Sequence, residues 1–211
     1  LDWDLLSSLT VLRLGRNALS GSFPNKLAHM STLRVLTLND NKFEGPLPHL
    51  TSLVSLDVFS LADNSFGGYL HGILPPGAPT LQAIDLSGNR FMGTLPEELW
   101  ALPRISIISM GRNCFNVDIP HEVCNMTTIE FLSFTGLNER CREDAFKHFS
   151  NQKKLAVQYD INFPDCIFGL PNLTHLHLAD NGMSVDLSSL TEDSLSPALM
   201  DLDLSYNDFH G

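Results

Sequence analysis

The 211-residue sequence has no apolar run that approaches the roughly 20 consecutive residues of a membrane-spanning helix. It is also poor in basic residues, since 13 lysines and arginines stand against 24 aspartates and glutamates, giving a net charge of −11. Nucleic-acid binding calls for a clustered basic face, so this charge argues against a nucleic-acid partner. An acidic surface leaves cationic peptides, basic protein patches or calcium as partners, although it often only confers solubility.

Catalytic signatures are missing as well. The sequence contains no phosphate-cradling glycine loop, no HExxH, no GxSxG and no CxxC. We therefore expect neither an enzyme nor a bound cofactor, and we look for function in a surface instead of a reaction centre.

What the sequence does contain is one repeated unit, clearest at residues 81–96 (LQAIDLSGNRFMGTLP). The asparagine of this unit returns through the chain with gaps of 24, 23, 25, 24, 68 and 26 residues, at Asn17, Asn41, Asn64, Asn89, Asn113, Asn181 and Asn207. The long gap contains a degenerate copy in which Leu137 stands where asparagine is expected. A fixed period in the twenties with this signature predicts a leucine-rich-repeat solenoid.

The spacing within the unit explains the fold. Apolar residues alternate as in a short strand, for example Ile84 and Leu86, and stacked copies bury these residues in one continuous core. We predict an α/β solenoid: a right-handed superhelix of about eight coils, with a parallel β-sheet on the concave face and short 3-10 or irregular segments on the convex face. Each asparagine can satisfy backbone groups where the coil turns.

One copy is irregular. An extra segment at about residues 138–157 restores the period when it is removed, so we expect an insertion that contacts a ligand or is simply tolerated at the surface. We expect residues 1–211 to form a single leucine-rich-repeat domain and a fragment of a longer chain. The first residues lack the basic region of a signal peptide, and the last stop where other copies continue.

The residues between the core leucines are predicted to project from the concave face. The first such column contains Val11, Val35, Val58, Ala83, Ile107, Phe131, His175 and Asp201. The second contains Arg13, Thr37, Ser60, Asp85, Ser109, Ser133, His177 and Asp203. An exposed apolar band marks a binding surface more often than not, although these side chains could instead lean into the sheet. The ligand-binding candidates are Val58, Ala83, Asp85, Ile107, Ser109, Phe131, His175, His177, Asp201 and Asp203.

The last two coils bring imidazoles beside carboxylates, since His175 and His177 should lie next to Asp201 and Asp203. Such a group could bind a divalent metal or respond to pH near 6 to 7. Asp85 occupies the same repeat position as Asp203, so an aspartate there also fits a purely structural pattern, and we do not predict a metal site.

The combined unit LxxLxLxxNxFxGxLP resembles the plant-specific class of leucine-rich repeats. That class occurs in the ectodomains of receptor kinases and receptor-like proteins and in polygalacturonase-inhibiting proteins. The resemblance covers nearly the whole chain and implies a scaffold whose members differ in their ligands. The family's usual cysteine-paired N-terminal cap is absent.

Four cysteines lie between residues 114 and 166, and they allow three disulfide connectivities or four buried free thiols. Cys124 and Cys166 match cysteine positions that the family places on adjacent coils, so the resemblance implies Cys124–Cys166, with Cys114–Cys141 as the second pair. Two sequons, at Asn125 and Asn172, lie where plant-type repeats are commonly glycosylated. Disulfides and glycans together predict an extracellular or cell-surface location.

The favoured function is a non-catalytic extracellular recognition module of a receptor-like protein, which binds a peptide or protein on its concave face. One alternative is a structural or adhesive component of a surface assembly, in which neighbouring subunits are the partners. Another is an inhibitor of secreted wall-degrading enzymes that uses acidic concave residues. The full-length sequence would distinguish them, because a membrane span and kinase would favour the receptor.

Overall fold

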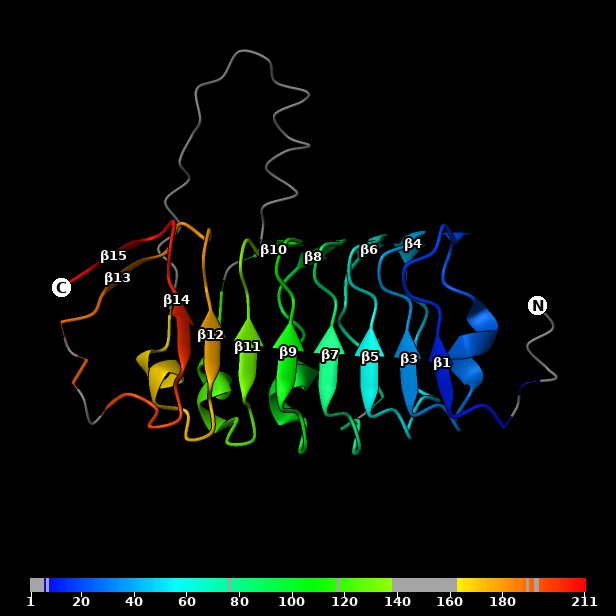
Figure 1. The fold of residues 1–211 in the computed structure, drawn as a ribbon, viewed down its shortest axis with the longest axis horizontal. Helices are drawn as coiled ribbons and strands as arrows, with labels where there is room; N and C mark the ends of the chain where they lie inside the picture. The colour runs from blue at the N-terminus through cyan, green and yellow to red at the C-terminus, as the bar shows by residue number, and fades with distance from the viewer. Residues whose placement is uncertain are drawn as a thin grey trace, which may run out of the picture.

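The computed structural model describes residues 6, 8–75, 77–116, 118–137, 163–188, 190–191 and 194–211. Within these residues, eight short strands form one parallel sheet in strictly sequential order (Figure 1). The strands are β1 (Val11–Arg13), β3 (Val35–Thr37), β5 (Val58–Ser60), β7 (Ala83–Asp85), β9 (Ile107–Ser109), β11 (Phe131–Ser133), β12 (His175–His177) and β14 (Asp201–Asp203). The predicted solenoid of about eight coils with a parallel sheet is therefore confirmed.

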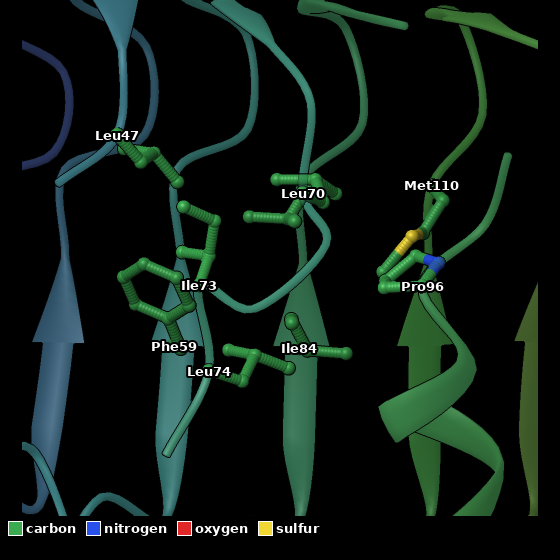
Figure 2. Close-up of a pocket in the computed structure, with 9 residues that line it drawn as sticks. Leu47, Phe59, Leu70, Ile73, Leu74, Ile84, Pro96 and Met110 are labelled. Carbon is green, nitrogen blue, oxygen red and sulfur yellow. The ribbon is translucent and has the colours of Figure 1, made fainter. Parts of the chain in front are cut away.

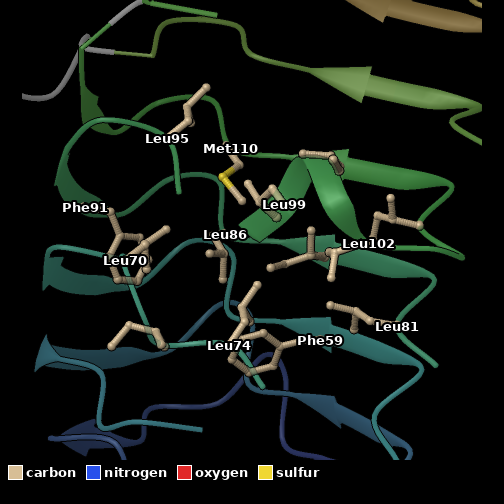
Figure 3. Packing of buried hydrophobic residues seen from close by; sticks show 14 of the residues in the cluster. Phe59, Leu70, Leu74, Leu81, Leu86, Phe91, Leu95, Leu99, Leu102 and Met110 are labelled. Carbon is tan, nitrogen blue, oxygen red and sulfur yellow. The ribbon is translucent and has the colours of Figure 1, made fainter. Parts of the chain in front are cut away.

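The sheet strands from β3 to β12 place their middle residue in the core and their two flanking residues outward, whereas Leu202 in the last strand, β14, is 43% exposed. Along β7, Ile84 is fully buried while Ala83 and Asp85 are half-buried. The leucines before and after the strand are buried too, and the coils share one hydrophobic cluster that runs along the solenoid (Figure 3). A single coil could not bury its apolar edge alone, so the stacking of neighbours stabilises each one.

An asparagine ladder runs beside the sheet, as expected from the sequence. The carboxamide of Asn89 donates to the carbonyls of Leu61, Leu86 and Ser87, and its oxygen accepts the amide hydrogen of Phe66. Asn41, Asn64 and Asn113 repeat this arrangement. Each asparagine thus binds its own coil and the preceding coil, which satisfies backbone groups that burial would otherwise leave unpaired.

The ladder changes at the coil that lacks an asparagine. Leu137 is fully buried there, and its main-chain carbonyl accepts the amide hydrogen of Phe115 at 2.9 Å. In the regular coils an asparagine side-chain oxygen accepts the corresponding hydrogen. The backbone of Leu137 therefore takes over one of the functions of the missing side chain.

A second sheet borders the ladder, and the sequence analysis did not predict it. Its parallel strands are β2 (Ser20–Gly21), β4 (Lys42–Pro46), β6 (Ser65–Gly68), β8 (Arg90–Gly93) and β10 (Cys114–Phe115). A smaller parallel pair joins β13 (Ser184–Asp186) to β15 (Asp208–His210). Inward phenylalanines of these strands stack in a continuous row, with ring centroids 5.8 to 6.5 Å apart from Phe43 through Phe66 and Phe91 to Phe115.

The opposite side of the coils carries short 3-10 helices, each following a proline. They are η2 (Asn25–His29), η3 (Glu97–Ala101), η4 (His121–Asn125) and η5 (Asp165–Gly169). The coil that follows Asn64 has turns instead over residues 70–74, just before Pro75. Behind these turns lies an apolar cavity of about 10 Å³, lined by residues such as Phe59, Ile73 and Met110 (Figure 2).

The predicted insertion at residues 138–157 lies outside the described residues. Among the residues that the structure describes, no helix is long and apolar enough to cross a membrane.

Candidate ligand-binding face

The outward side chains of the eight-stranded sheet form two continuous columns. Strand pairing places Val11 beside Val35, and the same register continues through Val58, Ala83, Ile107, Phe131 and His175 to Asp201. The second column follows the same pairings through Arg13, Thr37, Ser60, Asp85, Ser109, Ser133, His177 and Asp203. All ten candidate residues therefore lie on one surface, which we call the sheet face.

The apolar part of the sheet face remains accessible. Ile107 is 39% exposed although it lies in the middle of the sheet, and Phe131 beside it is half-buried. Next to them the second column is small and hydroxylic, with Ser109 and Ser133. An apolar strip with small neighbours leaves room for an approaching chain to reach the sheet.

Phe131 and the two histidines form a ring cluster at the C-terminal end of this strip. The Phe131 ring lies 5.7 Å from the imidazole of His175 and 5.4 Å from that of His177 between centroids, and the two imidazoles are 6.4 Å apart. These separations are those of tilted and edge-to-face aromatic pairs. The three rings thereby support one another's orientation while they stay partly exposed.

Carboxylates of β14 complete the cluster. His177 Nε2 lies 2.9 Å from Asp201 Oδ2, a diagonal contact across the register that sequence reasoning had not resolved. His175 Nδ1 instead lies 2.8 Å from the Thr174 hydroxyl. Hydrogen bonds from the side chain and then the backbone of Ser205 lower the pKa of Asp203, and His177 contributes a smaller Coulombic effect. Asp203 is therefore held in its charged form.

Metal binding finds no support in this geometry. Within the described part of the chain, no group of three or more histidine, cysteine, aspartate or glutamate side chains converges as a metal site requires. The imidazoles and carboxylates of the ring cluster pair with each other or with hydroxyls instead of pointing at one centre.

A polar groove of about 440 Å³ opens beside the starts of β7, β9 and β11, and it is lined by residues that include Gln82, Arg104, Glu130 and Asn172. The sequon asparagines lie on this side of the molecule. Asn125 is the exposed last residue of η4, and the exposed Asn172 donates a hydrogen bond to the carbonyl of Thr127 at 2.7 Å. Both acceptor sites are therefore at the surface.

The structure joins Cys124 to Cys166, with their Cα atoms 5.6 Å apart. This bond links η4 to η5, and it is the pairing that the family resemblance implies. Cys114 is disulfide-bonded too. Cys141, its expected partner, lies outside the described residues.

Comparisons with known proteins agree with this architecture. The family profile described as Leucine Rich Repeat matches residues 8–30 and 80–102, and a second profile described as Leucine Rich repeat matches residues 169–186. Receptor-like protein 35 of Arabidopsis thaliana is 36% identical over 110 residues, which are 52% of this chain and 11% of that protein. Receptor-like protein 39 of the same plant is 28% identical over 221 residues, covering 100% of this chain and 24% of its own length.

Among solved structures, the leucine-rich-repeat ectodomain of the Arabidopsis receptor kinase HAESA superimposes with a TM-score of 0.75 at 29% identity. The match covers 97% of this chain and 31% of the receptor chain, which was crystallised with an N-terminally extended IDA peptide hormone. Repeat signature, sheet geometry and relatives together identify a leucine-rich-repeat solenoid. The chain is similar to plant receptor-like proteins, and it spans only 11% and 24% of the two relatives named above.

Proposed function

We propose that this chain is one leucine-rich-repeat domain, a portion of a receptor-like ectodomain outside the cell, and that it binds a peptide or protein on the sheet face without catalysing a reaction. The observation that carries the proposal is the apolar strip at Ile107 and Phe131. It is exposed at the centre of a sheet whose strands are fixed by neighbours on both sides.

Two features support a ligand of extended conformation. The outward side chains repeat at each strand, so the sheet face presents regularly spaced groups over eight coils, and the first column is apolar from Val11 to Phe131. Rigid strands also need no ordering when a ligand binds, which lowers the entropic cost of association. The related HAESA ectodomain was crystallised with a peptide hormone, which makes a peptide the first ligand class to test.

The test uses a displayed library of random peptides, selected on the immobilised protein. Peptides selected on the wild type should lose binding when Ile107→Asp and Phe131→Asp are combined, because charged side chains would interrupt the apolar strip. Met92→Asp is the matched control: Met92 is 40% exposed, close to the 39% of Ile107, but lies on β8 of the second sheet. Selected peptides that bind the double variant unchanged would exclude the sheet face as the binding surface.

The proposed location rests on the disulfide between Cys124 and Cys166 and on the two surface sequons. When the chain is expressed through a secretory pathway, Asn125 and Asn172 should each carry a glycan. Intact-mass measurement should show one glycan mass lost in Asn125→Gln and one in Asn172→Gln. A secreted wild type with the unmodified polypeptide mass would contradict the glycosylation.

A further inference from the structure

The C-terminal end of the sheet face has a charge distribution of its own. Asp201 and Asp203 lie on β14, next to the ring cluster of Phe131, His175 and His177. The side chain of Asp201 is 53% exposed although it contacts His177. Carboxylates therefore reach solvent directly beside an aromatic surface.

The electrostatic surroundings of the two imidazoles favour one class of ligand. The charged groups that face them are Asp201 and Asp203, while the facing residues of β11 are Phe131 and Ser133, with Glu130 immediately before the strand. Neutral imidazoles leave this end of the face with the charge of its carboxylates. The chain as a whole carries −11, so complementarity favours a cationic group.

Protonation of the imidazoles would remove this preference for a cation. Two imidazolium groups would balance the charges of Asp201 and Asp203. His177 Nε2 already lies 2.9 Å from Asp201 Oδ2. A protonated His177 would therefore form an ion pair with the same carboxylate that a basic ligand needs. In acid, the imidazolium of the protein would thus take the place of the ligand's basic group beside Asp201.

The geometry points to a basic peptide as the occupant of this end of the sheet face: an apolar side chain packs on Ile107 and Phe131, a lysine or arginine lies beside Asp201 and Asp203, and acidification releases the peptide through His175 and His177. This inference rests on the proposed function, because it specifies the ligand of the same surface. The Phe131 ring can add a cation–π contact to the basic group.

The peptides selected at about pH 7.5 on the wild type serve as probes. Their sequences should be enriched in lysine or arginine near an aromatic or aliphatic residue, relative to the unselected library. Affinity of a selected peptide should fall about threefold to tenfold between about pH 7.5 and pH 5, the size expected for partly exposed charges. Enrichment of acidic or uncharged sequences would overturn the inference.

Three variants separate the inference from the proposed function. Asp201→Asn with Asp203→Asn should weaken binding about tenfold at neutral pH, as expected for the loss of two partly exposed charges. Asp165→Asn removes an exposed carboxylate on η5, on the opposite side of the coils, and as the control it should leave affinity within about twofold. His175→Gln with His177→Gln should bring the ratio of the affinities at about pH 7.5 and pH 5 close to one, whatever its effect on the affinity at about pH 7.5.

Each combination of results decides between the two claims. Binding that needs Ile107 and Phe131 but is indifferent to Asp201, Asp203 and pH would overturn the basic-peptide inference and leave the sheet face as the binding surface. Binding indifferent to all of these residues, or no enriched peptide at all, would overturn both.

Discussion

Arg112 donates through Nη2 to Asp63 Oδ1 at 2.8 Å, although the two residues lie two coils apart. The residue at the corresponding position of the coil between them is Gly88, whose φ is +67°. A Cβ on Gly88 would collide with the carboxylate of Asp63. The ion pair therefore exists because the intervening coil has no side chain at this position.

This relationship predicts the cost of Gly88→Ala. Left-handed backbone strain and loss of the ion pair should together lower the free energy of unfolding by about 2 kcal/mol, whereas the strain alone should cost about 1 kcal/mol. In an Asp63→Ala background only the strain remains, so chemical denaturation should report the smaller value. Gly45→Ala is a control, because Gly45 has φ of +80° and open space around it. Equal losses for Gly88→Ala in both backgrounds would refute the steric link.

A second prediction concerns the shared carbonyls of the asparagine ladder. The carbonyl of Leu86 accepts from both Asn89 and Asn113, so either asparagine can be lost without leaving it unpaired. Asn89→Leu alone should cost about 1 to 3 kcal/mol through the unpaired amide of Phe66. Combining Asn89→Leu with Asn113→Leu should cost about 1 to 2 kcal/mol more than the sum, because the Leu86 carbonyl then loses both donors.

The control for this cycle is the pair Asn64→Leu and Asn113→Leu. These asparagines donate to different carbonyls, so their losses should add to within about 0.5 kcal/mol. Urea denaturation of the single and double variants measures both couplings. The shared-carbonyl account fails if the adjacent and the separated pairs are equally additive.

The disulfide between Cys124 and Cys166 should stabilise the fold. It closes a loop with a sequence separation of 42, and the combined variant Cys124→Ala, Cys166→Ala should lose about 2 to 4 kcal/mol of unfolding free energy. The denaturation midpoint measures this loss. Peptide mapping after partial reduction should recover Cys124–Cys166 and, as the remaining prediction, Cys114–Cys141. A Cys114–Cys124 peptide would contradict both pairs.

The hydrogen bonds from Ser205 to Asp203 should make the stability of the fold depend on pH in the acid range. Because the Ser205 hydrogen bonds lower the pKa of Asp203 below its ordinary 3.8, the charged carboxylate stabilises the fold above that pH. This contribution is lost as pH falls through the lowered pKa. Ser205→Ala should move the titration midpoint of the Asp203 carboxyl upward, measured by carbon NMR. Asp186, whose pKa is lowered by Ser188, should be unaffected and provides the internal control.

The sequence predicted the sheet and its outward columns because both follow from one repeating unit. Once Asn89 is assigned its position in the repeat, Ile84 is predicted to be buried and Ala83 to point outward. The stacking of coils then places Ala83 beside Ile107. The same logic located Phe131 next to His175. The binding role of these residues stays a prediction, since a column defines a surface without naming what occupies it.

The repeat pattern could not predict contacts that depend on side-chain conformation. Equivalent positions predicted His177 beside Asp203, whereas rotamers bring it to Asp201. The ion pair from Arg112 to Asp63 skips a whole coil and leaves no periodic trace. The second sheet was missed because its strands are only two to five residues long and follow the asparagine without regular alternation.

The bond that joins η4 to η5 has a topological consequence. Residues 138–162 connect Leu137 to Phe163, and the disulfide ties Cys124, before that connection, to Cys166, after it. A protease that cut the chain between Leu137 and Phe163 would leave two pieces that the disulfide still holds together. The nicked molecule would keep β11 paired with β12, and its cleavage would be visible only under reducing conditions.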